Sequence, residues 1–192
     1  MRRFVVIVLL GLIFSGCSGI RYSEISPEAA DFHPKRIGVF PVDVGTYEDA
    51  RGVIDKIVAD VLVDTQWFTS VVAADMVNQQ IRSNDDIGRI YLDYLSKLKA
   101  LSYSDPELSR KIGNDFDIDS FLVIDIIYWN YTKAGDDKVA RVEAGIKMIN
   151  ASTGTIIWRA HHHVVESYRV IAPELPNIAK KLMRDMIREM PR

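Results

Sequence analysis

The sequence is poor in the residues and motifs that mark common enzyme classes. Cys17 is the only cysteine in 192 residues, which excludes an intramolecular disulfide, a CxxC redox pair and a cysteine-rich zinc site. The phosphate-loop motifs GxxxxGK[ST] and GxGxxG, the GxSxG elbow and HExxH are also missing. A formal net charge of −2 leaves no general basic footprint for nucleic acid. We therefore expect no cofactor, no nucleic-acid partner and no catalysis.

The amino terminus has the pattern of an export signal. Two arginines precede the uncharged apolar run Phe4–Phe14, which is shorter than the roughly 20 residues that a membrane-spanning helix needs. Ser15 and Gly16 then lead into Cys17. This arrangement resembles the lipobox of bacterial lipoprotein precursors, in which a peptidase cuts just before a lipid-modified cysteine. The resemblance implies a signal peptide over residues 1–16 and acylation of Cys17. A plain export signal with an incidental cysteine is the alternative.

The mature chain is expected to start with a membrane anchor and a spacer. Each buried methylene contributes about 0.8 kcal/mol, so several acyl chains on Cys17 would hold the protein to a bilayer durably. In enterobacterial lipoproteins an Asp after the cysteine favours the inner membrane. This chain has Ser18 there, so the resemblance implies the periplasmic face of the outer membrane. Residues 17–35 show no sustained period and end in a proline turn, which predicts a flexible tether.

Residues 36–192 are predicted to form a single α/β domain with a mixed sheet. Arg36–Val42 is a short β-rich apolar run, apolar residues recur at helical spacing over 50–62, and Phe68–Ala74 forms a second strand pattern. This order predicts a βαβ unit with two parallel strands. Helical patterns over 75–82, over 87–98 and from Asp105 to about Gly113 fill the middle of the domain.

The rest of the domain is predicted to be an antiparallel three-stranded meander and a final helix. The strand patterns cover 120–131, 139–150 and 155–168, and a helix follows over about 175–190. We expect the even-numbered positions of the meander to face the core. A three-residue loop between the last two strands would place Glu143 opposite His163 and Lys147 opposite Arg159. On the final helix, Ile178, Leu182 and either Met183 or Met186 are expected to pack inward.

Two segments of this domain carry a resemblance to known proteins. They are "IGNDFDIDSFLVIDIIYWNY" and "MINASTGTIIWRA", in which Thr153 and Gly154 precede Trp158. The pattern resembles a group of bacterial envelope lipoproteins and domains: CsgG, LpoB, the amino-terminal domain of TolB and neisserial-type surface lipoproteins. The resemblance implies the fold and no catalytic residue. A CsgG-like pore is disfavoured, because residues 85–101 show a helical pattern instead of added barrel strands.

The odd-numbered face of the meander holds the candidate binding residues. Its members are Asp125, Ile127, Trp129, Tyr131, Arg141, Glu143, Lys147, Arg159, His161 and His163. One interpretation is a solvated or helix-covered face whose charges pair across strands. The other is a binding face for an envelope protein with Trp129 and Tyr131 as anchors, since aromatics in a polar rim are typical of interfaces.

The run of three histidines allows a second, catalytic interpretation. On a strand, His161 and His163 share one face while His162 points to the other. With Glu143 or Asp125 as a third ligand, the two imidazoles could bind zinc or iron. A patch that responds to pH is another use of these rings. His162 itself is expected to be partly buried and hydrogen-bonded.

The sequence thus favours a lipid-anchored envelope accessory protein. It would bind and position other components of an export, transport or cell-wall machine. The partner-binding candidates are Trp129, Tyr131, Glu143, His161 and His163. The alternatives are a metal-dependent envelope enzyme that uses His161, His163 and Glu143, or a homo-oligomeric scaffold.

Overall fold

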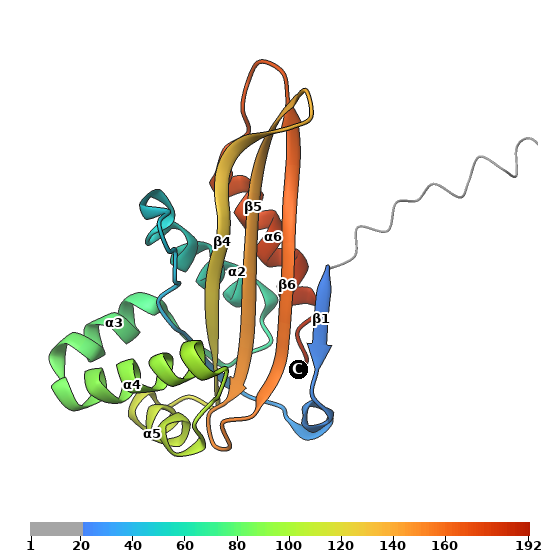
Figure 1. Cartoon of the computed structure of the whole chain (residues 1–192). Helices are drawn as coiled ribbons and strands as arrows, with labels where there is room; N and C mark the ends of the chain where they lie inside the picture. The colour runs from blue at the N-terminus through green and yellow to red at the C-terminus, as the bar shows by residue number, and fades with distance from the viewer. Residues whose placement is uncertain (1–20) are drawn as a thin grey trace, which may run out of the picture.

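A six-stranded mixed sheet organises the computed structural model, which describes residues 21–192 (Figure 1). The strand order is β1-β6-β5-β4-β2-β3. The strands are β1 (Tyr22–Ile25), β2 (Arg36–Val39), β3 (Ser70–Val72), β4 (Ser120–Ala134), β5 (Asp137–Asn150) and β6 (Ile156–Tyr168). The helices are η2 (Pro27–Asp31), η3 (Glu48–Ala50), α2 (Val53–Thr65), α3 (Ala74–Ser83), α4 (Asp85–Leu101), α5 (Pro106–Phe116) and α6 (Leu175–Arg188). The predicted α/β class, helical middle, meander and final helix are confirmed.

The predicted βαβ unit is present, with a later helix start. Strand β2 pairs in parallel with both β3 and β4. Helix α2 begins after Gly52, which ends the preceding turn and has a φ of 73°. The carboxylate of Asp55 accepts hydrogen bonds from the backbone N–H groups of Gly52 at 3.1 Å and Val42 at 2.8 Å. One side chain therefore caps the helix and ties its start to the chain that leaves β2.

The meander has the predicted register. Strands β4, β5 and β6 pair in antiparallel fashion, with Glu143 opposite His163 and Lys147 opposite Arg159. The turn between β5 and β6 contains Gly154 at a φ of 75°, and a Cβ there would lie 2.8 Å from the Cα of Pro106 at the start of α5. This glycine is needed both for its left-handed backbone and for the close approach of α5.

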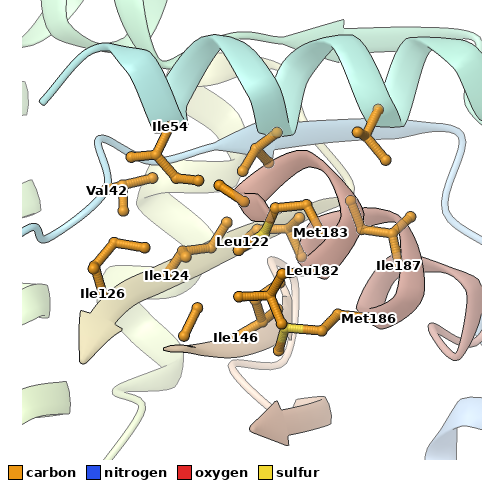
Figure 2. Packing of buried hydrophobic residues seen from close by; sticks show 14 of the residues in the cluster. Val42, Ile54, Leu122, Ile124, Ile126, Ile146, Leu182, Met183, Met186 and Ile187 are labelled. Carbon is orange, nitrogen blue, oxygen red and sulfur yellow. The ribbon is translucent and has the colours of Figure 1, made fainter. Parts of the chain in front are cut away.

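Two apolar clusters cover opposite faces of the sheet. The larger one joins α2 and α6 to the inner faces of β4–β6, and Figure 2 shows Ile54, Leu122, Ile146 and Leu182 meeting there. Met183 and Met186 are both fully buried. Both residues that the sequence left as alternatives therefore pack into the core. The smaller cluster packs α3–α5 against the other face, near β2, around a stack of Phe40 on Phe121.

The predicted flexible tether is wrong for residues 22–31. Strand β1 pairs with β6, and η2 follows it. The Oγ atom of Ser23 accepts a hydrogen bond from the buried indole of Trp158 at 3.0 Å, and the backbone N–H of Ser26 donates to the carbonyl of Ile157 at 2.9 Å. All four residues of β1 are exposed, so the sequence has no apolar alternation that would reveal the strand. The predicted signal peptide and Cys17 lie outside the described residues.

Candidate functional site

The sheet face opposite α2 and α6 is the candidate site. Helices α3–α5 cover only its β2 end, and the strands of the meander are open beyond it (Figure 1). We call this open surface the meander face: Asp125, Tyr128, Arg141, Glu143, Lys147, Arg159, His161 and His163. Strand β1 extends the same surface, because Tyr22 lies opposite His161 and Glu24 opposite Arg159. The exposed fractions of the Lys147 and Arg159 side chains are 34% and 45%.

A β-bulge in β4 changes which aromatic residues belong to this surface. The register of β4 against β5 shifts between Ile126 and Tyr128, so Tyr128 lies opposite Glu143 and Trp129 lies opposite Val142. One extra residue exchanges the two faces for the rest of the strand. The predicted placement of Trp129 and Tyr131 on the open face is therefore wrong, because the bulge breaks the strict alternation of side chains along β4. No sequence signal marks the bulge, and Tyr128 was missed as the aromatic residue of the meander face.

Trp129 is a core residue. Its side chain belongs to the cluster under α2 and α6, and only 3% of the residue is exposed. Its indole Nε1 donates a hydrogen bond to Oδ2 of Asp49 at 3.0 Å. Both properties are those of a structural tryptophan that links β4 to the turn before α2.

Tyr131 lies on the same side of the sheet as Trp129, farther along β4. Its ring meets that of Tyr168 edge-on at 6.0 Å, and its hydroxyl donates to the carbonyl of Pro173 at 3.0 Å. It is still 42% exposed. Tyr131 therefore holds the loop between β6 and α6, and it is not part of the meander face.

Glu143 is the buried centre of the meander face. Oε1 accepts a hydrogen bond from Nε2 of His161 at 2.7 Å, and Oε2 accepts one from the guanidinium of Arg141. That guanidinium also lies 4.8 Å from the centre of the Tyr128 ring. Burial opposes ionisation of Glu143, but its bonds to Arg141 and His161 outweigh burial, and the pKa of Glu143 is lowered. The carboxylate is thus held ionised, and it fixes two neighbouring side chains.

The other two histidines lie near Arg21 at the β1 edge. Nδ1 of His163 is 3.5 Å from the Arg21 guanidinium, and Nδ1 of His162 accepts a hydrogen bond from the Arg21 backbone N–H at 3.2 Å. His162 pairs with the buried Ala144, which confirms that it points away from the meander face. Burial lowers the pKa of both His162 and His163. Both rings therefore resist protonation in the folded state.

The predicted metal-binding set does not fit this geometry. Both oxygens of Glu143 already accept hydrogen bonds from protein groups. Asp125 instead lies over Gly145, where a Cβ would be 2.8 Å from Oδ2, and its other oxygen is 3.8 Å from Nζ of Lys147. Among residues 21–192, no group of three His, Cys, Asp or Glu side chains is placed to hold a metal ion. His161, His163 and Glu143 therefore do not form such a group in the described part of the chain.

Solved structures show the same fold at low sequence identity. PelC from Paraburkholderia phytofirmans, crystallised as a dodecamer, superposes with a TM-score of 0.55 at 14% identity, over 86% of this chain and 92% of that chain. Lipoprotein GNA1162 from Neisseria meningitidis gives a TM-score of 0.55 at 16% identity, over 82% and 100%. The hypothetical protein CT253 from Chlamydia trachomatis gives 0.54 at 8% identity, over 80% and 93%. No family model and no curated protein matches the sequence.

These similarities define the fold and leave the finer grouping as a prediction. A neisserial lipoprotein is among the similar structures, as the sequence pattern implied. The likeness to CsgG, LpoB and the TolB domain stays a prediction from the sequence. Within the described part of the chain, no helix is long and apolar enough to span a bilayer.

Proposed function

We propose that this protein is a lipid-anchored accessory protein of the bacterial cell envelope that binds other envelope components through the meander face. The observation that carries the proposal is an open sheet face with a buried, hydrogen-bonded centre at Glu143 and a partly exposed rim. The rim includes Tyr22, which is 47% exposed, as well as Lys147 and Arg159. A fixed centre surrounded by partly exposed charged and aromatic side chains is a common arrangement at protein interfaces.

In this proposal the anchor is the acylated Cys17, at the periplasmic face of the outer membrane. The sequence pattern before Cys17 supports the anchor, and the shared fold with a neisserial lipoprotein is compatible with it. The role is binding without catalysis. Glu143 and His161 are the side chains best suited to acid–base chemistry. They are bonded to each other and so serve to order the surface.

Charge reversal on the meander face tests the proposed binding role. Lys147→Glu and Arg159→Glu each alter a partly exposed side chain of the surface, while Lys111→Glu alters an exposed residue of α5 as the matched control. After chemical crosslinking in membranes, we expect the two meander variants to lose the crosslinked envelope partner and the control to retain it. Equal recovery of the partner with all three variants would contradict the proposal.

Self-assembly into a homo-oligomeric scaffold is a second candidate function. PelC, which shares the fold, was crystallised as a dodecamer. In this chain β1 pairs only with residues 158–161 of β6. The edge of β6 beyond His161 therefore has no strand neighbour within the described residues, and unpaired edges favour strand addition. Light scattering on detergent-purified protein decides this: a single-chain mass would remove the scaffold role, and a multiple of it would support the role.

A further inference from the structure

The loop between β6 and α6 exposes two adjacent aliphatic side chains. Val170 is 91% exposed and Ile171 is 85% exposed, more than any other large apolar residue of the described chain. Figure 1 shows this loop extending beyond the sheet at the same end as the β4–β5 turn. Two almost fully exposed aliphatic residues at the end of a domain favour contact with an apolar phase.

The exposure of these residues is built into the fold. On one side of the loop, Tyr168 packs against Tyr131, and on the other side the Pro173 carbonyl accepts a hydrogen bond from the Tyr131 hydroxyl at 3.0 Å. Leu175, at the start of α6, is buried. Both ends of the loop are therefore fixed, and Val170 and Ile171 are held outward at its tip.

The short stretch between Cys17 and β1 limits how far the membrane anchor can lie from this loop. Strand β1 runs antiparallel to β6, so its first residue, Tyr22, is the one nearest the loop end of the sheet. Cys17 precedes Tyr22 by five residues, which span about 17 Å at most. The stretch of β6 from His161, opposite Tyr22, to Tyr168 rises about 23 Å. Even when fully extended, the stretch between Cys17 and Tyr22 leaves Cys17 short of the level of Tyr168. With β6 along the bilayer normal, the bilayer surface that holds an acyl chain on Cys17 therefore lies no farther out than the loop tip.

We propose that Val170 and Ile171 insert into the bilayer surface to which Cys17 is anchored. This inference rests on the proposed lipid anchor. The β4–β5 turn beside the loop has Lys133 and Lys138 balanced by Asp136 and Asp137, so the apolar side chains, and not a basic patch, provide the attraction. With the loop inserted, the strands of the meander stand away from the membrane, and the meander face is directed sideways toward partners.

Quenching by brominated lipid tests the insertion. The full chain is purified from bacterial membranes in detergent and reconstituted into vesicles of phosphatidylethanolamine and phosphatidylglycerol, with or without dibrominated acyl chains. Ile171→Trp places a fluorophore on the loop. Leu92→Trp, at a site that is 65% exposed on α4, is the matched control. We expect brominated lipid to quench the added emission of Ile171→Trp and to leave that of Leu92→Trp unchanged.

The outcomes separate the insertion from the anchor. Protein that floats with the vesicles while both added tryptophans escape quenching overturns the insertion and leaves the anchor intact. A blue shift of the Ile171→Trp emission without quenching shows that the loop contacts protein, either a second copy or a partner, and also overturns it. Protein that does not float with the vesicles refutes the anchor, and the insertion fails with it.

Discussion

Truncation of Trp129 separates a core role for this residue from a role in partner binding. The side chain is almost fully buried, and replacing such a residue with Ala costs about 3–5 kcal/mol in free energy of unfolding. For a domain of this size, 1 kcal/mol shifts the melting temperature by about 2–4 °C. Trp129→Ala is therefore expected to lower the melting temperature by roughly 6–20 °C.

A graded variant distinguishes packing from the hydrogen bond. Trp129→Phe keeps an aromatic ring and loses the bond from Nε1 to Asp49, which is worth about 1 kcal/mol. Thermal unfolding followed by circular dichroism should rank the melting temperatures as wild type, then Trp129→Phe, then Trp129→Ala. If Trp129→Ala melts at the same temperature as the wild type and only loses its partner, the indole lies on an open surface and β4 has no bulge at Ile127.

Three further predictions concern the turn, the first strand and the histidines. Gly154→Ala should destabilise the domain by more than the roughly 1–2 kcal/mol of a left-handed backbone alone, because its Cβ meets α5. Gly135→Ala, at a φ of 63° with open space around it, should cost only that amount in chemical denaturation. Ser23→Ala should cost about 1–3 kcal/mol by leaving a buried indole N–H without its acceptor, and an unchanged denaturation midpoint would argue against β1. Because the folded state lowers the pKa of His162 and His163, the unfolded chain binds more protons as the pH falls below about 6.5, and stability should drop there. Melting temperatures at pH 7.5 and 5.5 should differ less once both histidines are replaced by Gln.

The sequence predicted most of the fold because the apolar pattern is strong where burial is one-sided. The period over 120–131 and 139–150 reflects strands that pack one face on α2 and α6, so both strands and the register of Glu143 could be predicted. Strand β1 could not be predicted, because its four residues are exposed and it is held mainly by backbone pairing and the bond from Ser23.

The candidate site could be predicted only in part. Glu143, His161 and His163 share the open face as the alternation of β5 and β6 required. Trp129 and Tyr131 do not, because the bulge at Ile127 inverts the alternation in β4. A bulge depends on how two strands pair, and this information is not contained in the pattern of one strand. The pairing of Glu143 with Arg141 also differs from the expectation, because charges were expected to pair across strands and both of these residues lie on β5.

The central claim is that the meander face contacts another envelope component. Its most direct test is photocrosslinking in living cells, with a photoreactive amino acid in place of Arg159 on the meander face or in place of Val63, which is 60% exposed on α2. We predict a discrete crosslinked band from position 159 and none from position 63. Crosslinks of equal yield from both positions, or from position 63 alone, would contradict the account.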